Sequence, residues 1–98
     1  MGQGNTIHLT DEQLLEVEEM AASLMTPGEI AILLGLSVEL FKYTIKSKPD
    51  HPIYLAYNKG RLKTKLTLRK MVIKLAEKGS PQAEMLADKY IRDQNIDT

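Results

Sequence analysis

The sequence predicts an all-α protein made of a three-helix unit, a long helix and a C-terminal helix. Apolar residues recur at intervals of three and four positions, which is the spacing of one helix face. Capping residues and prolines stand where the helices would begin, and glycines stand where two of them would end. No pair of alternating strands flanks a hairpin turn, so no β-sheet is expected.

The first helix is expected over residues 11–25. Thr10 and Gln13 form a capping box, and the acidic first turn suits the positive end of a helix. Its inward stripe would consist of Leu14, Val17, Ala21, Leu24 and Met25. The preceding residues, 1–9, offer little to bury and are predicted to be a disordered tail.

Residues 26–47 predict two short helices joined by a tight turn, the layout of a helix-turn-helix. Thr26 and Glu29 form a second capping box at the start of this segment. Gly35 tolerates the positive φ angle that a tight turn requires, and Ser37 is suited to cap the next helix. With the first helix, the pair would complete a three-helix unit.

The second helix of this pair separates its apolar and polar side chains. The apolar or small face holds Val38, Leu40, Phe41, Thr44 and Ile45, and the polar face holds Glu39, Lys42, Tyr43 and Lys46. A DNA-reading helix needs one face to dock on the protein and another for phosphates and base edges. The alternative is an ordinary helical hairpin with a solvated polar face. Glu39 is unfavourable beside phosphates unless it accepts a hydrogen bond from a cytosine amino group.

Two prolines, Pro49 and Pro52, exclude a helix between them, and Asp50 is expected to cap the helix that follows. A long helix would then span residues 52–78, and a last helix residues 81–94. The expected organisation is a tail at 1–9, a DNA-binding unit at 10–48 and a helical hairpin at 49–98, all within one compact domain.

The long helix carries two separate apolar stripes and one stripe of lysines. The first apolar stripe is Leu55, Leu62, Leu66 and Ile73, the second is Leu68, Met71, Val72 and Leu75, and the lysine stripe is Lys59, Lys63, Lys70 and Lys74. Two apolar stripes need two partners. One partner can be the rest of the chain and the other a second subunit, so a homo-oligomer is expected. The alternative is that the chain's own helices cover both stripes.

The net charge of zero hides a strong segregation of charge along the chain. Residues 1–41 carry seven acidic residues and no lysine or arginine, whereas residues 42–78 carry eleven lysines or arginines against two acids, a net +9. Such a basic segment indicates a polyanion such as double-stranded DNA. The alternative is charge pairing within or between subunits. The DNA-facing residues are expected to be Ser37, Lys42, Tyr43, Lys46, Lys48, Lys59, Lys63, Lys70 and Lys74.

Other classes of site are not indicated by the sequence. There is no cysteine, no apolar run long enough to span a bilayer, and no secretory signal pattern, so a cytoplasmic protein without a membrane partner is expected. His8 and His51 lack partners at motif spacing and are expected in solvent, and the methionines are expected to fill the core. We therefore expect no enzyme activity, no cofactor and no metal site.

The order of these motifs resembles the small terminase subunits of tailed phages. The resemblance lies in the turn Ile30-Ala31-x-x-Leu34-Gly35-Leu36-Ser37, the internal Asn58-Lys59-Gly60-Arg61 and the ending Leu75 to Ala83, where Ser80 replaces the usual Asn. It implies a DNA-packaging role, assembly into a ring and a large terminase subunit as partner. The alternatives are a small helix-turn-helix transcriptional regulator of phage or bacterial origin and a helical adaptor protein.

Overall fold

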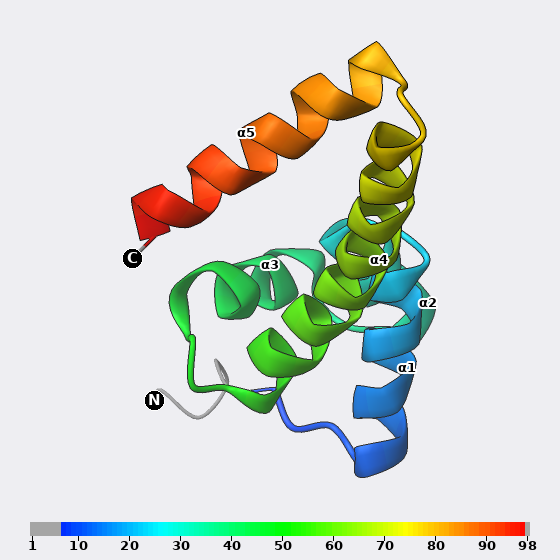
Figure 1. Ribbon diagram of the computed structural model, residues 1–98. Coiled ribbons are helices and arrows are strands. Elements are labelled where there is room, and N and C mark those ends of the chain that lie inside the picture. Colours follow the sequence, from blue (N-terminus) through cyan, green and yellow to red (C-terminus); the bar gives the residue numbers. More distant parts are fainter. Residues whose placement is uncertain (1–6, 98) are drawn as a thin grey trace. The chain divides into compact units, whose positions relative to one another are not determined.

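The computed structural model describes residues 7–97, and all of the secondary structure in this part of the chain is helical (Figure 1). The expected all-α class is therefore confirmed. The five helices are α1 (Asp11–Ala22), α2 (Pro27–Leu34), α3 (Val38–Ser47), α4 (Pro52–Glu77) and α5 (Pro81–Asp97).

The predicted caps form at the starts of the first three helices. The Thr10 hydroxyl accepts a hydrogen bond from the Gln13 amide at 3.1 Å, while the Gln13 side chain accepts one from the Thr10 amide at 2.9 Å. Thr26 and Glu29 repeat this arrangement. The Ser37 hydroxyl accepts from the Leu40 amide at 3.2 Å. These short-range bonds satisfy amides that no helical carbonyl can reach.

α1 ends at Ala22, three residues earlier than expected, and the next turn contains a backbone outlier. Leu24 has a φ angle of 67°, the left-handed conformation that glycine adopts most easily. The Met25 amide donates to the Met20 carbonyl at 3.1 Å, which closes the helix end as a Schellman motif. Leu24 was expected in the inward stripe, but 65 % of its surface is exposed because the turn carries it outward.

The chain divides into two compact units, Met1–Thr64 and Lys65–Thr98. The sequence analysis expected one compact domain with an internal boundary in the proline loop, whereas this division falls later in the chain. The division falls inside α4, because the first turns of this helix are packed into the core of the first unit while the later turns belong with α5. Residues 1–6 lie outside the described residues.

The core of the first unit is built around four fully buried side chains: Val17, Ile30, Phe41 and Ile53. Each comes from a different one of the first four helices. Ile7 also packs against this core and is only 7 % exposed. The prediction of an unburied tail is thus wrong for Ile7, whose apolar side chain packs with the core residues.

His51 joins the segment before α1 to the start of α4. Its Nδ1 accepts a hydrogen bond from the Ile53 amide at 3.0 Å, so the neutral ring carries its proton on Nε2 and donates to the Ile7 carbonyl, also at 3.0 Å. His51 therefore caps α4, the role expected for Asp50, and it is half-buried rather than in solvent. The expectations that Asp50 caps this helix and that His51 lies in solvent are therefore wrong.

α1 and α4 approach each other closely at Gly60 (Figure 1). A Cβ atom at this position would lie 3.0 Å from the Ala21 Cβ and would overlap the Glu18 carbonyl group. One turn later, the Thr64 hydroxyl donates to the Ala22 carbonyl at the end of α1. A buried glycine thus lets two helix backbones meet, and a hydroxyl satisfies a carbonyl that the end of α1 leaves unpaired.

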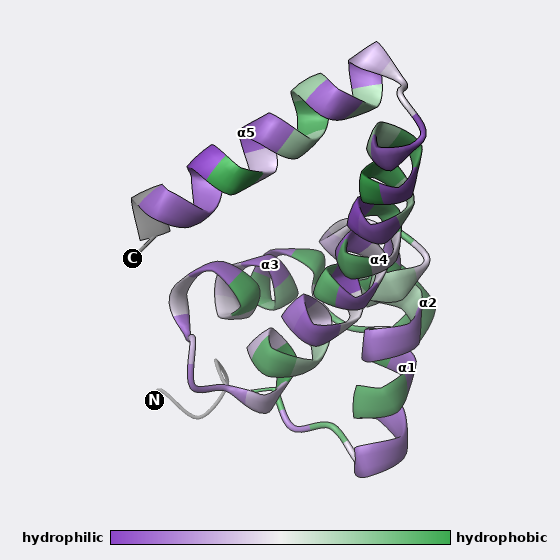
Figure 2. Ribbon diagram, viewed as in Figure 1, coloured by the Kyte–Doolittle hydropathy of each residue, from purple (hydrophilic) through white to green (hydrophobic). Residues whose placement is uncertain are grey.

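The second unit consists of the later turns of α4, a turn at Gly79 and α5. Gly79 has a φ angle of 95°, and the Ser80 hydroxyl accepts from the Ala83 amide at 3.3 Å. In the described part of this unit, Ala83 alone is buried. Hydrophobic residues are spread along both helices (Figure 2) and largely exposed: Leu66, Leu68, Met71, Ile73, Leu75, Met85, Leu86 and Ile91. Met71 and Met85 were expected in the core, and that prediction is wrong because they are 56 % and 71 % exposed.

Candidate nucleic-acid interface

α3 presents a polar face on a firmly packed apolar base. Phe41, Thr44 and Ile45 are buried, and the Thr44 hydroxyl donates to the Leu40 carbonyl at 2.9 Å. α3 follows α2 after a three-residue turn in which Gly35 has a φ angle of 72°. The expected separation of the two faces of α3 is therefore present.

The predicted DNA-facing residues of α3 and its cap are all exposed: Ser37, Lys42, Tyr43, Lys46 and Lys48. Ser37 is already engaged as the helix cap. The Lys48 ammonium lies 5.8 Å from the centre of the Tyr43 ring, within range of a weak cation–π contact. Lys42 and Lys46 project from the helix surface and form no ion pair among the described residues.

A groove of about 540 Å³ lies beside α3, between this helix and the first turns of α4. Its walls carry three cationic, two phenolic and one amide side chain: Lys42, Lys46, Arg61, Tyr54, Tyr57 and Asn58. No carboxylate of the described residues lines it. Because positive charge comes from two helices at once, the groove is suited to an anion.

The α4 side of this groove was missed by the sequence analysis. Tyr54, Asn58 and Arg61 follow a spacing of four and three, so they share one helix face. Nothing in the sequence places this face beside α3, since that neighbourhood depends on tertiary packing. The sequence analysis instead predicted DNA contacts for the lysine stripe, which lies on another face of the same helix.

Two members of that stripe, Lys59 and Lys63, lie beside α1. The Lys63 ammonium forms an ion pair with the Glu18 carboxylate. This hydrogen bond lowers the pKa of the Glu18 carboxyl below its ordinary value of 4.5, and the positive charges of Lys63 and Lys59 act in the same direction. The structure therefore brings Arg61, and not Lys59 or Lys63, together with the lysines of α3.

The other two, Lys70 and Lys74, are exposed in the second unit. They belong to a different compact unit from α3. A common surface with the α3 lysines therefore stays a prediction.

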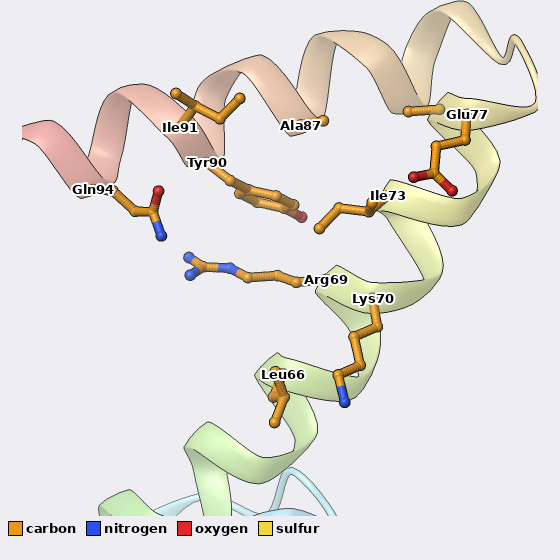
Figure 3. Close-up of a pocket in the computed structure, with 10 residues that line it drawn as sticks. Leu66, Arg69, Lys70, Ile73, Glu77, Ala87, Tyr90, Ile91 and Gln94 are labelled. Atoms are coloured by element: carbon orange, nitrogen blue, oxygen red, sulfur yellow. The ribbon is translucent and has the colours of Figure 1, made fainter.

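The second unit contains a groove of its own, of about 610 Å³, between α4 and α5. Figure 3 shows Ile73 of α4 and Tyr90 of α5 pointing toward each other, with the side chain of Arg69 extended alongside the ring. The Arg69 guanidinium lies 4.6 Å from the centre of the Tyr90 ring, and its Nε is buried without a hydrogen-bond partner among the described residues. The rest of the lining is mostly apolar, with Lys70 and Glu77 as its other charged residues.

Comparisons with models of known protein families, with curated proteins and with solved structures gave no match for this chain. Across the described residues, no three histidines, aspartates or glutamates gather where they could hold a metal ion. None of the described helices is both long and apolar enough to cross a membrane.

Proposed function

We propose that this protein binds double-stranded DNA through the polar face of α3. The observation that carries the proposal is the exposure of Lys42, Tyr43 and Lys46 on a helix whose opposite face is anchored by buried Phe41 and Ile45. A helix held in this way can present its side chains to a groove without losing its own packing. The three lysines of α3 and its C-cap supply the charge for phosphate contacts.

The test is a titration with duplex DNA at two salt concentrations. Each phosphate contact contributes about 0.9 to the slope of log affinity against log salt, so three lysines predict an affinity loss of about 40-fold between roughly 50 and 200 mM salt. Binding at neither concentration would reject the proposal and leave the helical adaptor as the better account.

We further propose that copies of the chain assemble through residues 65–98. A two-helix unit of this size is below the roughly 40 residues that usually fold without help from disulfides, metals or partners. Its large apolar residues lie on more than one face of α4 and along α5, so its intramolecular groove accounts for only part of this surface. Closed symmetric assembly is the common way to bury such a surface.

Light scattering tests this assembly. Leu68→Glu and Ile73→Glu, on different faces of α4 in the second unit, are the test variants, and Leu55→Glu is the matched control in the first unit. All three leucine or isoleucine side chains are about half exposed. At least one test variant is expected to dissociate the assembly while the control leaves it intact. A wild type that runs as an 11.0 kDa monomer would overturn the proposal.

By its resemblance to small terminase subunits, the proposed role is recognition of viral DNA for packaging in the cytoplasm of a host cell, without catalysis by this chain. The mass of the assembly distinguishes this role from that of a transcriptional regulator. A ring of about eight or more subunits favours packaging, whereas a dimer favours a regulator. Co-purification with a large terminase subunit would be a second, independent support for packaging.

A further inference from the structure

We propose that the groove between α3 and α4 holds a backbone phosphate of the duplex, with Arg61 as the ligand that α4 contributes. The inference rests on the proposed DNA binding and adds a second element to it. Lys42 and Lys46 belong both to the polar face of α3 and to the wall of the groove. A duplex that lies against α3 therefore brings its own backbone to this groove.

The charges in the groove are available to a ligand. In the part of the chain that the structure describes, Lys42, Lys46 and Arg61 form no ion pair with a carboxylate. The groove also lacks an acidic residue in its lining. Like charges gathered in a concave site repel one another, so a bound anion would reduce the electrostatic repulsion that is present in the free protein.

Asn58 holds Arg61 in place from one turn earlier in α4. The Asn58 Nδ2 donates to the Tyr54 carbonyl at 2.9 Å, which fixes the amide and turns its Oδ1 toward Arg61. The Arg61 Nη2 donates to that oxygen at 3.3 Å. A guanidinium has five N–H donors, so this bond leaves enough of them for a two-pronged contact with a phosphate. Asn58 is thus a positioning residue for Arg61.

Phosphate contact here would be independent of base sequence. Such contacts fix the orientation of a protein on the duplex, while base edges are read elsewhere. The arrangement assigns orientation to α4 and base contact to α3. Loss of the Arg61 contact should therefore weaken binding to every duplex by the same factor.

The experiment compares Arg61→Gln with Lys59→Gln in DNA titrations over a range of salt. Both variants remove one positive charge from the same stretch of α4, but Lys59 lies on the side near Glu18. Arg61→Gln is expected to reduce the salt slope by about 0.9, which corresponds to a loss of about 8-fold at 0.1 M salt. Lys59→Gln is expected to leave both quantities close to those of the wild type.

Two further variants and one change of salt separate the possible reasons for a loss of DNA affinity. Arg61→Lys keeps the charge, so it should retain the slope and lose affinity. Asn58→Ala should lower affinity and slope in part, at unchanged net charge; a lower melting temperature with an unchanged slope would reject its positioning role. Sodium phosphate in place of chloride at equal ionic strength should leave DNA binding unchanged, and a loss specific to phosphate would identify the groove as a site for a free anion instead.

The outcomes distinguish this inference from the proposed function. If the wild type does not bind DNA, the proposed function fails. If it binds and Arg61→Gln matches Lys59→Gln, DNA binding stands and the phosphate site in the groove is overturned.

Discussion

Substitution of Gly60 by alanine tests the close contact between α1 and α4. Alanine stabilises an ordinary helix interior by about 1 kcal/mol relative to glycine, so the substitution would normally be favourable. Here the new methyl group would overlap the Glu18 carbonyl and lie 2.9 Å from the carbon of that group. The obstacle is backbone, which cannot rotate aside as a side chain can.

The expected magnitude follows from three opposing contributions. Overpacking of a tight contact costs about 2 kcal/mol. Separation of α1 from α4 also weakens the hydrogen bond from Thr64 to the Ala22 carbonyl, for about 1 kcal/mol more. The gain in helix propensity offsets about 1 kcal/mol. We therefore expect Gly60→Ala to lower the free energy of unfolding by about 2 kcal/mol, or the melting temperature by roughly 10 °C.

Gly28→Ala is the matched control, because it makes the same change in α2 with ordinary space around it. The nearest heavy atom to a Cβ at Gly28 is the Lys42 Cε, at 3.7 Å. This control should leave stability unchanged or raise it by up to about 1 kcal/mol. Urea unfolding followed by circular dichroism measures both variants. If Gly60→Ala is as stable as the control, α1 and α4 do not meet as closely as described.

Three other predictions concern the first unit. Leu24→Gly should raise the unfolding free energy by about 1 kcal/mol because it relieves a left-handed φ angle, whereas Gly35→Ala should lower it by a similar amount; equal effects in thermal melts would contradict the turn geometry. Because the folded-state pKa of Glu18 is depressed, its stabilising effect is present above pH 4.5 and is lost as pH falls through the folded value. In the Glu18→Gln variant, the free energy of unfolding should therefore fall less steeply at acid pH than in the wild type. An equally steep fall would contradict a stabilising role for the Glu18 carboxylate. Phe41→Ala should lower the free energy of unfolding by roughly 3–5 kcal/mol. Lys46→Ala should lower it by less than about 0.5 kcal/mol while it weakens DNA binding. If the two variants melt at similar temperatures, the faces of α3 are misassigned.

Local signals in the sequence predicted most of the helix starts. Thr10, Thr26 and Ser37 cap the helices that were expected after them, because capping depends on residues only three positions away. The ends were less predictable. α1 ends through Leu24, a residue whose chemistry gives no stop signal, whereas Gly35 and Gly79 end their helices as glycine usually does.

The features that depended on distant parts of the chain were missed. Ile7 is buried in the core that the first four helices form, and its carbonyl binds the ring of His51, 44 residues away. Arg61 joins the α3 lysines only after α4 is packed against the core. Helical periodicity placed the apolar stripes of α4 on faces that are largely exposed, as at Leu55 and Leu62, and it contained no information on which face would meet α3.

α4 runs without a break from the first unit into the second. Formation of a first helical turn in an isolated segment is unfavourable by a factor of about 1,000, or roughly 4 kcal/mol. The turns of α4 that pack against α1 serve as a template, so the later turns grow from an existing helix and avoid this nucleation cost. In the assembly that we propose, partner copies would therefore have to supply only packing for residues 65–77, and not the start of the helix.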